Sequence, residues 1–388
     1  MAEGSPVGPV RPATIRFAQA DINELRDRLS ATRSAQFPFS TRWQHGTGSE
    51  ILRDVLDRWM EFDVHAFATR LNAIPQVDVE LEGVRIRAFH LAGETTDALP
   101  VILTHGWPSS VLEPLAVASR LARPSTYGAD PADSFHVVIP ALPGFPLSAA
   151  PSALDDYTAA RTADRWAQLM TALGYSRFAA SAGDIGARVT AWLGARHPDR
   201  TLGIHLSSNA LGPAPSGAKL SASEAAWLHG RTAWDREDGG YAHVQQTKPL
   251  SLAHGLADSP AGLAAWIVEK WRGWSAGADD VLAHFGAEEI LGNLSLYWFT
   301  NSIATSLIAY AVHDHPPGAR PAPHSVGVPV SFYLAPAENG GIPPREFAER
   351  HYKVERWTEL PRGGHFVGAE EPDLLADDIR AAFRPLRG

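Results

Sequence analysis

The stretch "AASAGDIGAR", Ala179 to Arg188, places one aspartate, Asp184, among small residues between an apolar run and a helical pattern. This arrangement predicts a short strand that turns sharply into a helix. Small neighbours are needed there because the backbone of such a corner is strained and the helix packs against the strand. The carboxylate is then presented at the end of the strand, where it can react. A helix-capping or turn aspartate is the alternative interpretation.

Strand and helix patterns alternate around this corner. Apolar runs of strand length, such as "LPVILTHG" and "VPVSFYLA", are separated by amphipathic patterns such as "TAARTADRWAQLMTALGY". The alternation predicts an α/β fold with a mostly parallel sheet that helices cover on both faces. In such a fold, the string from Ala182 to Gly186 fits the nucleophile elbow of α/β-hydrolases, with Asp184 in place of the usual serine.

Two segments differ from this core. Residues 1–95 hold helical patterns and end in the alternating run "QVDVELEGVRIRAFHL", which predicts a hairpin. Residues 212–324 are Trp-rich and helical, without strand signals, and linkers rich in Pro and Gly flank them. We therefore expect an N-terminal helical extension and a helical lid, the lid being inserted into an α/β-hydrolase core that spans 96–211 and 325–388.

A carboxylate and a histidine follow the elbow in the chain order expected for this fold. Glu338 comes after the strand pattern "VPVSFYLA", and His365 lies in the glycine-loosened stretch "LPRGGHFVG" before the last helix. The order of nucleophile, acid and histidine predicts a catalytic triad. Asn209 occupies the other place where such folds sometimes carry the acid, but an amide cannot replace it. A solvated Glu338 and a helix-capping His365 are the alternatives.

The stretch "THGWPSS" follows a predicted strand and offers backbone donors. We expect the N–H groups of Trp107 and of Ile185, the residue after the nucleophile, to form an oxyanion hole, and both side chains to line the substrate pocket. His105 is interpreted as a brace for this loop. His313 and His315 of "HDH" fall in a proline-rich linker and are interpreted as a solvated loop, so we expect no metal site.

Composition narrows the class of partner. The chain has 388 residues, a net charge of -9 and no cysteine. A nucleic acid or an anionic membrane would need a basic patch, which no run of Lys or Arg supplies here. The absence of cysteine excludes disulfides, thiolate metal sites and a cysteine nucleophile. We find neither a signal-peptide core nor a run of about 20 apolar residues. We therefore expect a soluble, cytoplasmic enzyme for a small molecule, with a homodimer left open.

The chain resembles the microsomal-type epoxide hydrolases, including their soluble fungal and bacterial relatives, over nearly its whole length. This resemblance implies conversion of an epoxide and water to a vicinal diol without a cofactor. It implies that Asp184 attacks the epoxide, that His365 with Glu338 activates water, and that the lid residues Tyr241 and Tyr310 hold the epoxide oxygen. The motifs that carry the resemblance are "HGWPSS", "ALPGF", "RTADRWAQLMTALGY", "AGDIG", "GGYAHVQQTKP", "LADSPAGLAAWIVEKW", "NLSLYW" and "RGGHFVGAEEPDLLADDI".

Two positions require separate interpretation within this resemblance: the second lid tyrosine and the residue after the nucleophile. Tyr297 lies in the same helical run as Tyr310, and we interpret it as a packing residue beside Trp298. Many relatives carry Trp directly after the nucleophile, where this chain has Ile185. The smaller side chain leaves the size of the substrate open and favours a bulky natural-product epoxide in a bacterium.

Two other functions are alternatives. A dehalogenase-like enzyme would also use an aspartate nucleophile, but it commonly needs an indole donor for halide at the position of Ile185. A non-catalytic binding relative would keep the fold without the chemistry. The complete set of Asp, Glu, His and two Tyr argues against that second alternative.

Overall fold

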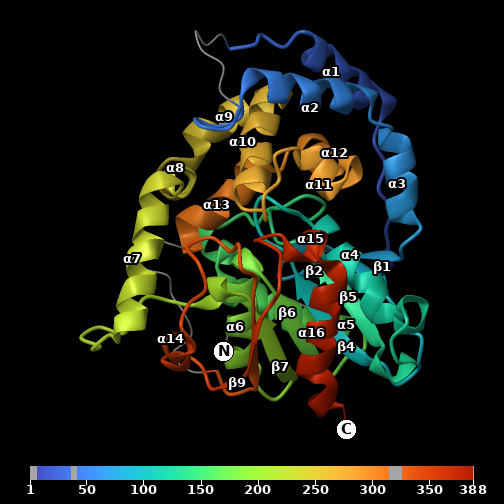
Figure 1. The fold of residues 1–388 in the computed structure, drawn as a ribbon. Helices are drawn as coiled ribbons and strands as arrows, with labels where there is room; N and C mark the ends of the chain where they lie inside the picture. The colour runs from blue at the N-terminus through green and yellow to red at the C-terminus, as the bar shows by residue number, and fades with distance from the viewer. Residues whose placement is uncertain (1–6, 36–41, 314–325, 388) are drawn as a thin grey trace.

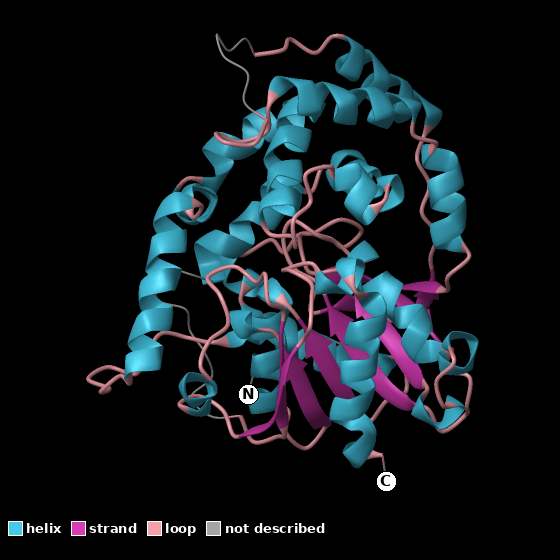
Figure 2. Ribbon diagram, viewed as in Figure 1, coloured by secondary structure: helices cyan, strands magenta, loops and turns pink. Residues whose placement is uncertain are grey.

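The computed structural model describes residues 7–35, 42–313 and 326–387, and within them one nine-stranded sheet (Figures 1 and 2). The sheet order is β1-β2-β3-β5-β4-β6-β7-β8-β9. The strands from β5 to β9 in this order pair in parallel, whereas β1, β2, β3 and β5 pair antiparallel, which confirms a mostly parallel sheet. The strands are β1 (Arg11–Pro12), β2 (Gln76–Leu81), β3 (Val84–Leu91), β4 (Leu99–Thr104), β5 (Phe135–Pro140), β6 (Phe178–Ala182), β7 (Thr201–Leu206), β8 (Val330–Leu334) and β9 (Val354–Glu359).

Helices cover both faces of this sheet. In β4, Ile102 belongs to the hydrophobic cluster that includes α5 (Ala159–Ala172) and α6 (Asp184–Arg196). Its neighbours Val101 and Leu103 belong to the cluster that includes α4 (Leu112–Ala122) and α16 (Pro372–Phe383). Because successive strand side chains point to opposite faces, these two helix pairs lie on opposite sides of the sheet. Burial on both faces explains the near-continuous apolar runs in the sequence.

The alternating run before β4 forms the predicted hairpin, β2 and β3. Val79 and Leu81 are buried while Glu80 is exposed, as the alternation predicts. The turn between the strands has left-handed φ values of 50° at Glu82 and 77° at Gly83. The strand β1 was not predicted, because a pair of residues is too short to show a periodic pattern.

The N-terminal helical patterns form α1 (Gln19–Ser30), α2 (Ser49–Glu61) and α3 (Val64–Asn72). The pattern across residues 49–74 is divided into two helices. The first ends at Glu61 with Phe62 as its C-cap, and Asp63 caps the second, its carboxylate accepting the N–H of Ala66 at 2.9 Å. Hydrophobic periodicity alone does not reveal this division, since apolar residues continue through the break.

The described part of the segment between β7 and β8 holds helices joined by loops and no strand, as predicted. Figure 1 shows α7 and α8 along one side of the molecule, and α9 to α13 on the same side of the sheet as the N-terminal helices. The helices are α7 (Ala222–Glu237), α8 (Gly240–Thr247), α9 (Pro249–Asp258), α10 (Pro260–Gly273), α11 (Val281–Phe285), α12 (Ala287–Phe299) and α13 (Ile303–His313). The shorter elements are α14 (Arg345–Glu349), α15 (Val367–Glu370), and the 3₁₀ turns η1 (Pro124–Tyr127), η2 (Pro131–Asp133), η3 (Leu154–Tyr157), η4 (Ser208–Ala210) and η5 (Arg384–Leu386).

The N-terminal helices brace this helical segment. Trp59 of α2 is fully buried, and its indole N–H donates to the Ser295 hydroxyl of α12 at 2.9 Å. The rings of Phe17 and Phe299 lie 4.7 Å apart between centroids. Both α1 and α2 also contact α10. Segments far apart in sequence therefore share one hydrophobic interior.

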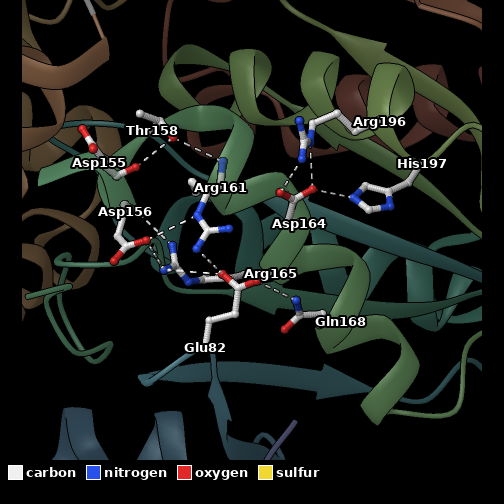
Figure 3. Close-up of polar contacts among 10 residues, drawn as sticks. All are labelled: Glu82, Asp155, Asp156, Thr158, Arg161, Asp164, Arg165, Gln168, Arg196 and His197. Atoms are coloured by element: carbon white, nitrogen blue, oxygen red, sulfur yellow. Dashed lines mark hydrogen bonds and ion pairs between the residues drawn. The ribbon is translucent and has the colours of Figure 1, made fainter. Parts of the chain in front are cut away.

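Charged side chains tie α5 to its neighbours (Figure 3). The Arg165 guanidinium, fully buried, donates to the Asp156 carbonyl at 2.7 Å and lies 3.8 Å from Glu82 Oε2 at the hairpin turn. Asp164 accepts two bonds from Arg196 of α6, at 2.8 and 2.9 Å. A buried charge is costly to leave without partners, so the contacts of Arg165 fix the position of α5 beside the hairpin turn. The pair of Asp164 with the half-exposed Arg196 links α5 to α6.

Some of the predicted features fall on residues outside the described ranges. The second predicted linker falls largely in 314–325, so that part of it and His315 lie outside the described residues, whereas His313, interpreted as part of a loop, is the last residue of α13. Within the described ranges, no group of three or more His, Asp or Glu side chains could hold a metal ion. None of the described helices combines the length and the apolar character needed to cross a bilayer.

Candidate active site

The predicted corner is a sharp junction between β6 and α6. Gly183 is extended, and Asp184 has a φ of 47°, in the left-handed region that residues other than glycine rarely adopt. A Cβ on Gly106 would lie 2.2 Å from Asp184 Oδ1, and one on Gly186 would lie 2.4 Å from the Thr104 carbonyl oxygen. These close approaches are the physical reason for the small residues around the aspartate.

His365 lies between two carboxylates. Its Nε2 is 3.5 Å from Asp184 Oδ2, and its Nδ1 is 2.8 Å from Glu338 Oε1. Backbone contacts position His365 and Glu338. The His365 N–H donates to the Trp274 carbonyl at 2.8 Å, and the Asn339 N–H donates to Glu338 at 3.0 Å. The fold therefore brings together the three residues predicted as nucleophile, acid and base.

The charges of this group shift one another's pKa values. Burial by itself would lower the pKa of His365, but the charge and hydrogen bond of Glu338, followed by the charge of Asp184, raise it to about 9. Burial by itself would raise the pKa of Glu338, but His365 holds it below its ordinary value. While both carboxylates are ionised, His365 therefore carries a proton at neutral pH.

The loop after β4 supplies a backbone donor to Asp184. The Trp107 N–H donates to Asp184 Oδ1 at 2.9 Å. Ile185 follows in the first turn of α6 with its side chain buried. His105 accepts the Leu142 N–H at 3.1 Å, and burial lowers the pKa of His105 to about 4. This histidine is a neutral brace of the loop, as the sequence predicts.

Tyr241 of α8 and Tyr310 of α13 meet at Trp107. Each ring centroid lies 5.7 Å from that of Trp107, and the two tyrosine rings lie 5.9 Å apart. The Trp274 ring is 5.0 Å from Tyr241 and 5.0 Å from His365, so aromatic rings connect the tyrosines to the histidine. Burial is the main cause that raises the pKa of Tyr310 well above its ordinary value, which keeps its hydroxyl protonated.

Comparison with known proteins identifies the family. The model of the epoxide hydrolase N terminus matches residues 10–114, and that of the alpha/beta hydrolase fold matches 100–246. A Stigmatella aurantiaca protein whose name places it among the epoxide hydrolases is 35% identical over 97% of this chain and 86% of its own length. Epoxide hydrolase 1 of Oryctolagus cuniculus is 30% identical over 95% of this chain and 88% of its own. The chain belongs to the epoxide hydrolase family.

Solved structures of epoxide hydrolases share the whole architecture. The Aspergillus niger epoxide hydrolase has a TM-score of 0.82 and 28% identity, covering 99% of this chain and 98% of its own. The juvenile hormone epoxide hydrolase of Bombyx mori has a TM-score of 0.85 and 26% identity, covering 98% of this chain and 95% of its own. The predicted α/β-hydrolase fold and the resemblance to epoxide hydrolases are confirmed.

Two further polar residues of this epoxide hydrolase are engaged elsewhere. Tyr297, fully buried on α12, donates its hydroxyl to the Ser109 carbonyl at 3.0 Å. Asn209 lies in η4, where its side-chain oxygen accepts the Ser207 hydroxyl at 2.7 Å. The carboxylate on the imidazole is that of Glu338. These contacts agree with the interpretation of Tyr297 as a packing residue.

Sequence reasoning missed three residues of this epoxide hydrolase site. Trp274 adjoins His365, and the Trp-rich composition of its segment could have flagged it. Tyr333 of β8 and Glu113 of α4 line a small cavity together with Asp184 and His365. Glu113 lies in the first turn of its helix, where an acidic residue is common because of the helix dipole. Its sequence position therefore gave no sign of a place beside the nucleophile.

Proposed function

We propose that this epoxide hydrolase acts in two steps, with Asp184 as the nucleophile. In the first step, a carboxylate oxygen attacks an epoxide carbon, the ring C–O bond breaks, and an alkyl-enzyme ester forms. A serine would form an ether instead, which water does not readily cleave. The strained position of Asp184, with one oxygen on the Trp107 N–H and the other toward His365, supports this role.

Tyr241 and Tyr310 are proposed as proton donors in this first step. Ring opening places negative charge on the epoxide oxygen, and a phenol can donate a hydrogen bond early and a proton late. Support comes from the meeting of both rings at Trp107, the residue whose N–H binds Asp184. The raised pKa of Tyr310 keeps its proton available until charge develops on the substrate.

In the second step, water attacks the ester carbonyl carbon and His365 accepts its proton. Glu338 orients the imidazole and stabilises its positive charge, while the N–H groups of Trp107 and Ile185 stabilise the tetrahedral oxyanion. The ester C–O bond then breaks, releasing the diol and restoring Asp184. His365 thereby regains the proton that it carries at rest, so the net change over both steps is addition of water. The position of the imidazole between the two carboxylates carries this proposal.

The charge of Asp184 also determines when His365 can act as a base. The raised pKa of His365 depends partly on the negative charge of Asp184. Esterification removes that charge, so the pKa of His365 falls once the intermediate has formed. His365 then gives the proton that it carries at rest to the tyrosine that protonated the epoxide oxygen, and the neutral imidazole can act as the base for ester hydrolysis.

We further propose that residues 212–324 act as the lid and 1–95 as the extension that braces it, over a core of 96–211 and 325–388. Both tyrosines lie on α7 to α13, which supports the lid assignment. The substrate is a small-molecule epoxide. Ile185, in place of an indole, leaves more room beside the nucleophile, which favours a bulky epoxide.

The ester mechanism can be tested with labelled water. Purified protein given styrene oxide, a haloalkane and a simple ester should produce diol from the epoxide and release no halide. In a single turnover in H₂¹⁸O, the label should enter the Asp184 carboxylate first, because water attacks the carbonyl carbon. Label in the diol during that turnover would show direct attack by water on the epoxide and would refute the ester.

We predict that Glu338→Gln slows ester breakdown much more than ester formation. Positive charge on His365 grows only during the second step, so loss of the carboxylate should reduce that rate by about 10²- to 10⁴-fold. Glu338 is also the main charge that raises the pKa of His365. The rate of ester breakdown increases with pH as His365 loses its proton, so this increase should occur at lower pH in the variant. Rapid-quench measurement of both steps checks this, and equal slowing of both would indicate a structural carboxylate.

A further inference from the structure

A small cavity lies against Asp184, and neither Tyr241 nor Tyr310 lines it. It measures about 40 Å³ and is bounded by the ends of β4, β6 and β8 and by α4, α15 and α16. Asp184 and His365 form one part of its wall, and Glu113, Ser109 and Tyr333 contribute polar groups to the rest. None of Trp107, Tyr241, Tyr310 or Trp274 lines it. Both groups that ester hydrolysis needs are therefore reached from this space.

Glu113 is held firmly at the cavity wall. A Cβ on Gly368 would lie only 3.2 Å from Glu113 Cγ, so α15 packs directly on this side chain. Its carboxyl group is hydrogen-bonded to Ser109, one turn earlier in the chain. Burial is the main cause that raises the pKa of Glu113 to about 7. The proposed two-step reaction uses the neighbouring Asp184 and His365 but assigns no role to this carboxyl.

The cavity has the size and polarity that ordered water requires. A water needs about 10–15 Å³ of such space and two to four polar partners, so about 40 Å³ accommodates two or three waters. Once the ester has formed, its alkyl group lies on the tyrosine side of Asp184. The attacking water must then come from elsewhere, and this cavity opens on both the Asp184 carboxyl and the imidazole.

We propose that this cavity holds the hydrolytic water and that Glu113 is a positioning residue, whose carboxyl hydrogen-bonds that water between His365 and the Asp184 ester. This inference rests on the proposed ester mechanism. The water oxygen bonds to Cγ of Asp184, and one of its protons passes to Nε2 of His365. The bond between Cγ and the alkyl oxygen then breaks, and the second proton of the water ends on that oxygen, which gives the diol and the Asp184 carboxylate. Glu113 exchanges no atom in this step.

The test is a comparison of Glu113→Leu with Glu113→Gln in single-turnover kinetics with styrene oxide. Leucine removes the hydrogen bond while filling similar space, and glutamine keeps a polar group at the same place. Ester breakdown should fall by roughly 10- to 100-fold in the leucine variant, as expected for loss of a hydrogen bond involving a charged group, and should largely recover in the glutamine variant. Ester formation should change by less than about threefold in both, within the scatter of indirect effects.

Glu289→Gln is the matched control. Glu289 is also a partly buried glutamate, and burial raises its pKa to about 8, but it does not line the cavity. The Glu289→Gln variant should keep the wild-type rates of ester formation and ester breakdown. An equal loss in Glu289→Gln, wild-type ester breakdown in Glu113→Leu, or equal slowing of both steps in Glu113→Leu would each overturn the proposal.

Val117→Ile gives a second test if Glu113→Leu fails to fold. Val117 lies one turn after Glu113 on α4 and lines the same cavity, so one extra methylene reduces the space for water. Ester breakdown should slow while ester formation is kept, and unchanged breakdown would overturn the proposal. If wild-type protein forms no ester on Asp184, the two-step mechanism itself is wrong. If the ester forms and no cavity variant slows its breakdown, only the role of the cavity is wrong.

Discussion

His365→Gln protein mixed with an excess of epoxide is expected to accumulate one covalent adduct per chain. Asp184 can still attack, since ester formation needs no base, but no group remains to take the proton from water. Loss of the histidine of a triad lowers turnover by about 10⁴-fold or more, so the ester should persist for hours. Intact-mass measurement followed by peptide mapping should place the added mass on the peptide that contains Asp184.

The control for this experiment is the double variant Asp184→Asn with His365→Gln. An amide cannot form the ester, so this protein should show no adduct under the same conditions. Normal turnover by His365→Gln would contradict the assignment of the base. An adduct on another peptide, or one that persists in the double variant, would contradict the assignment of the nucleophile.

The double variant Tyr241→Phe with Tyr310→Phe is expected to lose nearly all activity on epoxides. Removing one donor to a developing oxyanion typically costs about 10²- to 10³-fold in rate. Each single variant should lose less than this, because the remaining hydroxyl covers part of the loss, so the two effects are not additive. Burst kinetics should locate the defect in ester formation, and circular dichroism should show an unchanged fold.

Tyr297→Phe is the matched control for the tyrosine pair. Its hydroxyl donates to the Ser109 carbonyl, so its loss should lower the free energy of unfolding by about 1 kcal/mol. Epoxide turnover should stay within a few-fold of wild type. If Tyr297→Phe were the damaging change, or if the double phenylalanine variant retained near-wild-type activity, the epoxide oxygen would receive its proton from another group.

Features governed by local backbone constraints were readable from the sequence. The elbow is one, because a left-handed Asp184 and the close approach of Gly106 and Gly186 tolerate only small neighbours. The alternation of strands and helices along the chain, and the places of Glu338 and His365 after strand patterns, follow from periodicity and from the chain order of this fold. The fold class and the grouping of Asp184, Glu338 and His365 were predictable for this reason.

Features that depend on contacts between distant segments needed the tertiary structure. Tyr297 and Tyr310 have similar helical and apolar surroundings in the sequence, and only the packing shows that one reaches Ser109 while the other reaches Trp107. Glu113 looks like an ordinary first-turn acid until α4 is placed against the end of β6.

The same division applies to the helical extension, whose pattern shows helices but not their partners. Trp59 donates a hydrogen bond to Ser295, which lies 236 residues away in the sequence, and no local pattern predicts this contact. Local sequence restricts the backbone torsions and the face that each element buries, because these depend on neighbouring residues. It leaves open which buried faces meet, since that choice is made by the packing of the whole chain. In this epoxide hydrolase the sharp turn at Asp184 belongs to the first kind of information, and the surroundings of Asp184 belong to the second.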